Sequence, residues 1–302
     1  MNPSLHLSPE TAKGIEMGQP FVALESTLIA HGLPWPRNLQ TARAAEEAVR
    51  QHGVCPATIA IIQGRIHIGL IHSQLQELAT NKEVLKASRR DLAACIAMKR
   101  TAATTVAATM YLSHQAGIQI FATGGIGGVH RDANDTYDIS ADLVELSRIP
   151  VAVVCSGAKN LLDLPKTMEM LEFFSVPVIG YRTDRLPAFY VRSSSCPLEW
   201  QFETPNQIAR MLHAHWQMEG GGVVIVNPPP AEIALTEDEF NKAMSLAEKE
   251  AQAQGIRGKR LTPFLLQRLA AHTQGRTLDV NCALILDNAN LAAQIATSLA
   301  RL

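Results

Sequence analysis

The sequence is poor in the features that mark most nucleic-acid-binding and membrane proteins. Aromatic residues make up 5% of the 302 residues, and 27 Lys and Arg are matched by 28 Asp and Glu, which leaves a formal net charge of −1. Such a chain lacks the stacking platforms and basic faces that bind nucleic-acid polymers. No apolar run approaches the roughly 20 residues of a membrane-spanning helix. We therefore expect a protein that acts on small molecules and has neither a nucleic-acid nor a membrane partner.

Cysteine is also scarce and widely scattered. The chain has 5 Cys, with no CxxC pair among them, so neither a zinc ribbon nor a redox pair is indicated. The first residues show neither the basic nor the apolar stretch that is typical of a signal peptide. These features predict reduced thiols and a cytoplasmic location.

What the sequence does have is an alternation of two patterns. Short runs of nearly continuous apolar residues, typical of strands covered on both faces, are separated by longer stretches of helical periodicity. Strands are expected over residues 21–24, 58–62, 118–122, 151–155, 176–179, 223–226 and 283–286, and helices over 39–52, 73–80, 104–115, 161–173, 205–217, 237–254 and 288–302. The alternation predicts an α/β fold with a mostly parallel central sheet flanked by helices, in a single large domain over residues 1–302.

Two ionisable residues stand directly after predicted strands, where α/β proteins place their chemistry. Glu25 follows the first strand, and Lys159 follows the fourth through a Ser156-Gly157 turn. Burial disfavours the charged form of both groups, which suits Glu25 to general-acid catalysis and Lys159 to Schiff-base formation. The alternatives are a Glu25 that caps a helix or pairs with Arg, and a Lys159 that lies at the surface at a helix start.

Two further segments have the composition of anion-binding loops. Lys86, Arg89 and Arg90 place three cations within five residues, which predicts either a phosphate site or a solvated basic turn. Glycine occupies four of the five positions 124–128 after another strand. This loop does not match the dinucleotide or P-loop patterns. It predicts either a ligand loop whose amides approach an anion or a plain glycine-rich turn.

Carboxylates and amides complete the set of candidates. Asp138 and Asp142 either share a helix face or flank a helix cap at Ser140, and one exposed Asp with waters is a typical site for Mg²⁺ or Mn²⁺. Asn227 and Asn288 follow predicted strands, where they serve either to recognise a polar heterocycle or to form a turn.

Taken together, the motifs resemble those of the pseudouridine-5′-phosphate glycosidase family over nearly the whole chain, from about Pro20 to Ala300. The resemblance is carried by residues 23–27, 31–32, 56–60, 88–91, 103–107, 121–131, 138–142, 155–159, 187–189 and 262–266. It implies an α/β homotrimer that reversibly cleaves the C–C glycosidic bond of pseudouridine 5′-phosphate to uracil and ribose 5-phosphate. It also implies one divalent ion per subunit, typically Mn²⁺.

The resemblance assigns roles position by position. Lys159 matches the Schiff-base lysine of the family and Glu25 its proton donor. Asp138 matches the metal ligand. The substrate-binding positions of the family correspond to Lys86, Val106, Ser140, Ala141 and Asp142, and His130, in the glycine loop, is expected to help position the substrate.

Two other classes of function remain open on the residues themselves. One is a nucleoside hydrolase that uses Asp138, Asp142 and metal-bound water, with Lys159 on the phosphate. The other is a non-catalytic sugar-phosphate sensor. Glu25, Asp138 and Lys159 together argue against a sensor, since binding alone does not need all three.

Overall fold

A computed structural model describes residues 5–159, 161–256 and 261–302, without the side chains of Thr262 and Pro263. Its strands are β1 (Leu5–Leu7), β2 (Phe21–Glu25), β3 (Cys55–Ile62), β4 (Arg65–Ile68), β5 (Leu85–Ala87), β6 (Ala102–Thr104), β7 (Ile120–Ala122), β8 (Ala152–Cys155), β9 (Val178–Tyr181), β10 (Trp200–Phe202) and β11 (Val223–Val226). Its α-helices are α1 (Pro9–Glu16), α2 (Arg37–Arg50), α3 (His72–Thr80), α4 (Leu92–Ala97), α5 (Val106–Gln115), α6 (Ala133–Thr136), α7 (Ala141–Arg148), α8 (Leu164–Phe173), α9 (Pro205–Gln217), α10 (Glu237–Ala253), α11 (Leu261–His272) and α12 (Arg276–Leu299).

All of these strands belong to one sheet. Its main path runs β1-β4-β3-β2-β7-β8-β11-β9-β10, with β6 paired to β3 and β5 to β6. From β3 to β10 along this path every pairing is parallel, and the antiparallel pairings are β3 with β4 and β3 with β6. The predicted α/β fold with a mostly parallel central sheet in a single domain is confirmed.

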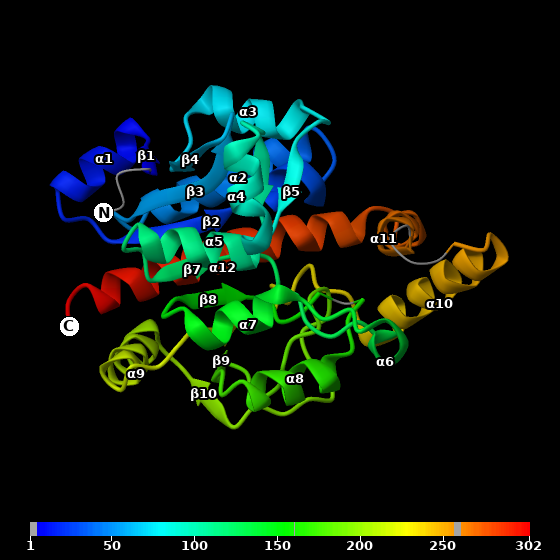
Figure 1. Ribbon diagram of the computed structural model, residues 1–302. Helices are drawn as coiled ribbons and strands as arrows, with labels where there is room; N and C mark the ends of the chain where they lie inside the picture. Colours follow the sequence, from blue (N-terminus) through cyan, green and yellow to red (C-terminus); the bar gives the residue numbers. More distant parts are fainter. Residues whose placement is uncertain (1–4, 160, 257–260) are drawn as a thin grey trace.

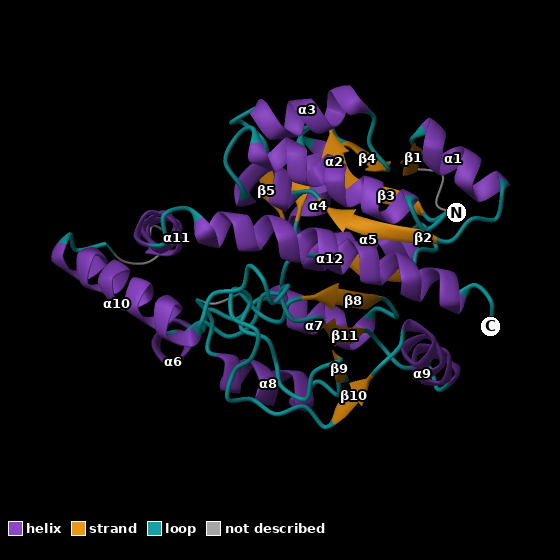
Figure 2. Cartoon of the chain, turned by 180° about the vertical axis from the view of Figure 1, so that it is seen from behind, coloured by secondary structure: helices purple, strands orange, loops and turns teal. Residues whose placement is uncertain are grey.

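Helices cover both faces of the sheet, as continuous apolar strands require. Along β8, Val153 and Cys155 pack with residues of α5, α7 and α8, while Ala152 and Val154 pack with residues of α2, α9 and α12. Figure 1 shows α5 and α7 on one side of the sheet, and Figure 2 shows α12 crossing the other side between α2 and α9. Segments on both faces of the sheet can therefore contribute side chains at the carboxyl ends of the parallel strands.

The predicted strand over residues 283–286 is wrong, because this run lies inside α12. Leu284 and Ile285 are 0% and 3% exposed, since α12 packs against the three helices α2, α9 and α11 and against the three strands β2, β7 and β8. A helix buried on several sides is apolar nearly all round, and a four-residue apolar run in it looks the same as a buried strand. The predicted helix over residues 288–302 is the second half of the same helix.

The other predicted elements are present within a few residues of their expected bounds, and their ends have clear causes. Helix α5 begins at Val106 because the Thr105 hydroxyl caps it, so Thr104 falls in β6. Helix α8 begins at Leu164, after the cap at Asp163. Short elements such as β1, β4, β10 and α7 were not predicted, because three to eight residues carry too little periodicity.

One pair of helices stands apart from the sheet. Helices α10 and α11 pack against each other and extend away from the sheet (Figure 1). Within the described residues, no helix is both long enough and apolar enough to cross a membrane.

Candidate active site

Glu25 is the last residue of β2, and the residue is 7% exposed. The side-chain oxygens of Glu25 accept hydrogen bonds from the hydroxyls of Thr27 and Thr123. Glu25 takes part in none of the ion pairs found among residues 5–159, 161–256 and 261–302. The expected burial is therefore present, and the alternative of an Arg partner is not. Sequence reasoning missed both threonines, although Thr27 stands two residues away.

A cluster of buried hydroxyl groups fixes the end of β2 behind Glu25. The Ser26 hydroxyl donates to the carbonyl of Ile59 at 2.6 Å and accepts from the backbone N–H of Thr104 at 2.9 Å. The Thr104 hydroxyl donates to the same Ile59 carbonyl at 2.7 Å. These bonds join the ends of β2 and β6 to the middle of β3, which fixes the backbone next to Glu25.

The glycine loop after β7 runs beside the segment that carries Lys159. The backbone N–H of Lys159 donates to the Ile126 carbonyl at 3.1 Å, and the N–H of Ile126 donates to the Gly157 carbonyl at 3.1 Å. Gly157 has φ +83°, and a Cβ there would lie 2.2 Å from the Pro187 carbonyl oxygen, so the turn before Lys159 requires glycine. Because Thr123 begins the same loop, one loop contacts Glu25 and flanks Lys159.

Lys159 is exposed in this chain, so the expectation of a lysine held in a low-dielectric pocket is wrong for the chain on its own. The turn at Ser156 and Gly157 carries the backbone out of the buried strand, and the lysine follows the turn to the surface. Its backbone is fixed by the glycine loop, while its amine is open to solvent and to a ligand.

The glycines of the loop serve close packing more than anion binding. The backbone N–H groups of Gly127 and Val129 donate to Asp142 Oδ2 at 2.8 Å and to the Thr167 hydroxyl at 3.0 Å. A Cβ at Gly127 would lie 2.2 Å from Ser140 Oγ. The expectation that the loop presents its amides to a ligand is therefore wrong for these two amides and for that of Ile126, which are used inside the protein.

Asp142 is buried and joins two segments of the site. Its Oδ1 accepts from the backbone N–H of Ala107 at 2.9 Å, so that its two oxygens tie the start of α5 to the glycine loop. Val106, the first residue of α5, is 1% exposed. Both residues lie where the resemblance places substrate contacts, and Asp142 acts here as the group that holds the surrounding backbone.

The segment before α7 brings four more predicted residues together. The Ser140 hydroxyl caps α7, and Ala141, its first residue, is exposed. Asp138 lies outside the helix, so the two aspartates flank a cap and the alternative of a shared helix face is wrong. The Asp138 side chain is 63% exposed, and its Oδ2 lies 3.8 Å from His130 Nε2.

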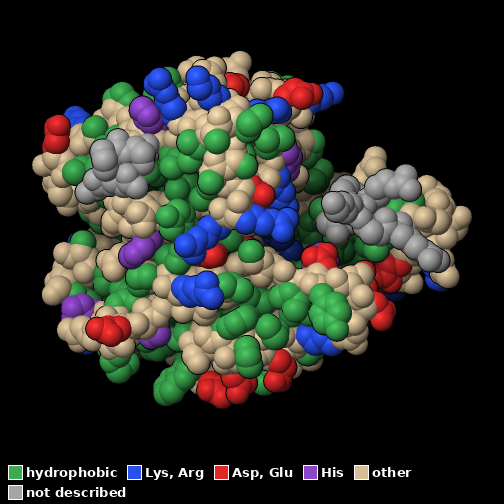
Figure 3. Space-filling view, viewed as in Figure 1, with side chains coloured by type: hydrophobic (Ala, Val, Ile, Leu, Met, Phe, Trp, Pro, Cys, Tyr) green, Lys and Arg blue, Asp and Glu red, His purple; other side chains and the backbone are tan. Residues whose placement is uncertain are grey.

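Of the predicted basic run, Lys86 and Arg90 remain exposed, and the Arg90 side chain lies 3.7 Å from the Asp91 carboxylate. Lys86 is on β5, whereas Arg89 pairs with the buried Glu145 at 2.5 Å and lies over the ring of Tyr111. Partial burial lowers the pKa of His31, and the positive charge of Lys86 lowers it further. His31 therefore lies beside Lys86, a proximity that the sequence did not reveal. Figure 3 shows Lys and Arg side chains gathered near the middle of this face.

Asn288 connects three strand ends from the opposite face of the sheet. Its amide nitrogen donates to the Thr123 carbonyl at 2.9 Å and to the Ser156 hydroxyl at 3.1 Å, and its oxygen accepts from Asn227 at 3.1 Å. The side chain is 0% exposed, so neither heterocycle recognition nor turn formation describes it. No local pattern could have shown this role, because the contacts cross the sheet.

The donor set around Asp138 fits a hydrated divalent cation. No cluster of three or more His, Cys, Asp or Glu side chains that could hold a metal occurs within the described part of the chain. An exposed carboxylate with open space around it suits Mg²⁺ or Mn²⁺, which keep several waters and accept one or two protein carboxylates. Asp138 is such a carboxylate, with His130 beside it.

Comparisons with known proteins agree with the resemblance drawn from the sequence. The model of the family described as indigoidine synthase A like protein matches residues 10–298. A pseudouridine-5′-phosphate glycosidase of Caldanaerobacter subterraneus subsp. tengcongensis is 50% identical, with 100% of this chain and 99% of that protein covered. One of Paracoccus denitrificans is 52% identical, with 99% and 100% covered.

Two solved structures share the fold. The prealnumycin C-glycosynthase, determined in complex with ribulose 5-phosphate, has a TM-score of 0.92 and 37% identity, with 100% of this chain and 98% of that chain covered. An indigoidine synthase A-like protein from Thermotoga maritima has a TM-score of 0.88 and 34% identity, with 98% and 97% covered. With a family model matching almost its whole length and enzymes about half identical to it from end to end, the chain belongs to the pseudouridine-5′-phosphate glycosidase family, whose model is that of the indigoidine synthase A-like proteins.

Proposed function

We propose that this enzyme reversibly cleaves the C–C glycosidic bond of pseudouridine 5′-phosphate to give uracil and ribose 5-phosphate. The observation that carries the proposal is the arrangement of Glu25 and Lys159 on one loop network. The buried Glu25 carboxylate has no counter-ion among the residues that the structure describes, and the Lys159 amine is accessible. The names of the relatives support the substrate. The C-glycosynthase supports C–C glycosidic chemistry on this fold, and its complex supports a pentose phosphate as ligand.

A C–C glycosidic bond has no leaving-group oxygen, so protonation of a bridging oxygen, on which ordinary glycosidases depend, is not possible. In the proposed sequence Glu25 protonates O4′ as the C1′–O4′ bond breaks and the ribose ring opens. The Lys159 amine, once neutral, then forms a bond to C1′. Protonation of the uracil carbon and cleavage of the C1′–C5 bond release uracil, and the nitrogen lone pair forms the C1′ imine. Water hydrolyses the imine, which returns the lysine and gives ribose 5-phosphate.

The remaining residues would bind the substrate. Lys86 is an exposed cation suited to the phosphate, on β5 beside β6, the strand that leads into α5. Ser140 and Ala141, at the start of α7, would contact the substrate, and His130 would position it. One divalent ion per subunit, typically Mn²⁺, would be held by Asp138 and would supply positive charge for orienting the substrate. The test is uracil release with and without EDTA, and equal rates would remove the metal from the proposal.

The decisive experiment is trapping of the imine with borohydride in the presence of ribose 5-phosphate. We expect a covalent adduct on the native chain, none on Lys159→Ala, and an undiminished adduct on Lys82→Ala, which removes another exposed lysine. An adduct that survives Lys159→Ala would assign the imine to a different amine. The absence of any adduct would favour a hydrolase that uses metal-bound water.

The proposal also includes a homotrimer in the cytoplasm. Leu246 on α10 and Leu266 on α11 are exposed on the pair of helices that leaves the sheet, which is where contacts between subunits are expected. The five cysteines are all free thiols, in keeping with a reducing compartment. Light scattering of the purified protein measures the mass directly.

A further inference from the structure

A hollow of about 430 Å³ lies between the loops after β9 and β11 and the second half of α12, and neither Glu25 nor Lys159 is among its lining residues. Its lining includes Tyr181, Arg182 and Arg192 on one side and Asn227, Asp287 and Gln294 on the other. The volume falls within the range of about 300–1,000 Å³ that is usual for small-molecule sites.

The charges in this hollow are not balanced within the chain. In the part of the chain that the structure describes, neither Arg182 nor Arg192 forms an ion pair. Each is held by a backbone carbonyl instead, Arg182 by Glu203 at 3.1 Å and Arg192 by Pro229 at 2.6 Å. One guanidinium nitrogen is used in each contact, which leaves donors on both arginines for an anion.

The single carboxylate in the lining does not cancel the two arginines. Asp287 accepts from the Asn227 side chain at 2.8 Å, so one of its oxygens is already occupied by an amide. Arg182 is further oriented by the ring of Tyr181, 4.9 Å from its guanidinium carbon. The hollow thus carries oriented positive charge next to amide groups.

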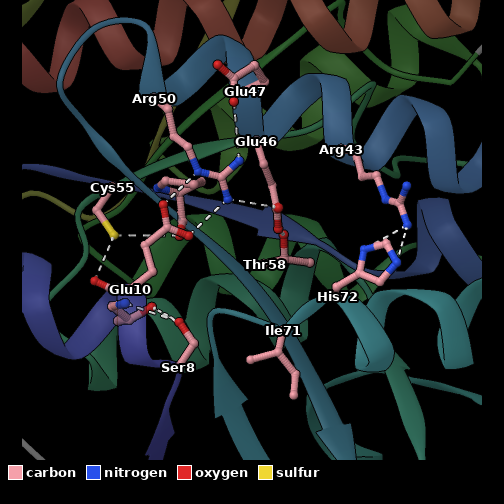
Figure 4. Close-up of polar contacts among 12 residues, drawn as sticks. Ser8, Glu10, Arg43, Glu46, Glu47, Arg50, Cys55, Thr58, Ile71 and His72 are labelled. Atoms are coloured by element: carbon pink, nitrogen blue, oxygen red, sulfur yellow. Dashed lines mark hydrogen bonds and ion pairs between the residues drawn. The ribbon is translucent and has the colours of Figure 1, made fainter.

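A larger hollow of about 660 Å³ lies between α1, α2 and α3 and has the opposite balance. Figure 4 shows Arg50 surrounded by Glu10, Glu46 and Glu47, with which it forms ion pairs at 2.6, 3.2 and 3.6 Å. The three carboxylates outnumber the two arginines of the lining, Arg43 and Arg50, and leave no excess of positive charge. The larger hollow has more room for a ligand, but the excess of positive charge makes the smaller hollow the better site for an anion.

We propose that the smaller hollow binds a phosphate monoester of a small polar molecule, either a sugar phosphate or a nucleoside monophosphate. Arg182 and Arg192 would bind the phosphate, since guanidinium groups match its geometry. The amides of Asn227 and Gln294 would form hydrogen bonds with the polar remainder of the ligand. The proposed catalytic residues Glu25 and Lys159 do not line this hollow, and the proposal does not rest on the proposed reaction.

The test is calorimetric titration of the native chain and of Arg182→Gln/Arg192→Gln with ribose 5-phosphate and, separately, with uridine 5′-monophosphate. We expect the double variant to bind one equivalent fewer than the native chain, or to bind that equivalent at least about tenfold more weakly. Loss of binding with both probes indicates that the phosphate alone is recognised, and loss with one identifies the sugar phosphate or the nucleotide as the ligand. Equal stoichiometry and affinity in the native chain and the double variant with both probes would overturn the proposal.

Two control variants assign the lost equivalent to the hollow. Arg185→Gln removes a neighbouring exposed arginine that contacts the Ser195 carbonyl, and it should bind like the native chain. Lys86→Ala should retain the equivalent that the double variant loses. If Lys86→Ala abolishes that equivalent, the binding belongs to the catalytic site and the proposal is wrong. Equal thermal midpoints for the native chain and the double variant would show that folding is unchanged.

Discussion

Glu25 and Glu46 are both buried carboxylates, 7% and 5% exposed, but their partners differ. Glu46 accepts from the Thr58 hydroxyl at 2.7 Å and pairs with Arg50 at 3.2 Å. Glu25 has hydroxyl donors alone and takes part in no ion pair of residues 5–159, 161–256 and 261–302. A buried charge without a counter-ion costs stability, and it is tolerated chiefly where the group is used. The comparison therefore separates a structural carboxylate from one suited to catalysis.

The largest effect expected from this comparison is on turnover. Glu25→Gln keeps the shape of the side chain and removes its proton donor, so we expect the rate of uracil release to fall about 10²–10⁴-fold. Glu46→Gln, the matched change in the structural carboxylate, should leave the rate within about threefold. Binding of ribose 5-phosphate by Glu25→Gln should remain measurable. If binding is lost together with turnover, Glu25 is a binding residue and its role as a proton donor is wrong.

For stability, the comparison predicts that the structural carboxylate Glu46 matters through its ion pair with Arg50. Arg50→Ala leaves Glu46 buried without its counter-ion, which in a fully buried pair costs about 3–5 kcal/mol. Arg50 is about one third exposed, so solvent screening reduces the expected loss to about 2–3 kcal/mol. Urea unfolding measures it, with Arg43→Ala on the same helix as the control. A loss as small as that of Arg43→Ala would show that Glu46 is tolerated without Arg50.

Asp142 adds a third kind of buried carboxylate, one held by backbone amides. In Asp142→Ala the N–H groups of Ala107 and Gly127 lose their acceptor, and leaving buried donors unpaired costs about 1–3 kcal/mol. Because the glycine loop and the start of α5 lose their common anchor, turnover should fall as well. Asp138→Ala, an exposed change in the same segment, should leave the free energy of unfolding unchanged. A stable Asp142→Ala with normal turnover would contradict the anchoring role.

The three carboxylates also show how far the sequence could predict the site. A charged residue directly after a continuous apolar run, as at Glu25, can be recognised locally, because a strand end fixes where the side chain lies. The connections made by Asn288 and Asp142 depend on contacts between segments far apart in the chain, and no local pattern reports them. The same limit led to the wrong strand at residues 283–286. The sequence left open whether Lys159 is buried or exposed, because the direction of a turn is set by its packing, here that of Gly157 against Pro187.

The smallest predicted effect is the pH dependence of stability caused by Glu46. Burial raises the pKa of the Glu46 carboxyl, and the opposing effects of Thr58 and Arg50 are smaller. The folded state then favours the protonated acid more than the unfolded state does. Stability from Glu46 is fully present below the ordinary carboxyl pKa of about 4.3, and it is lost as the pH rises through the raised pKa. In urea unfolding between about pH 4 and pH 7, the stability of the native chain relative to Glu46→Gln, which cannot titrate, should therefore fall. A relative stability that rises with pH would mean that the charge pair with Arg50 outweighs the cost of burial, and Glu46 would then be a carboxylate stabilised in its charged form.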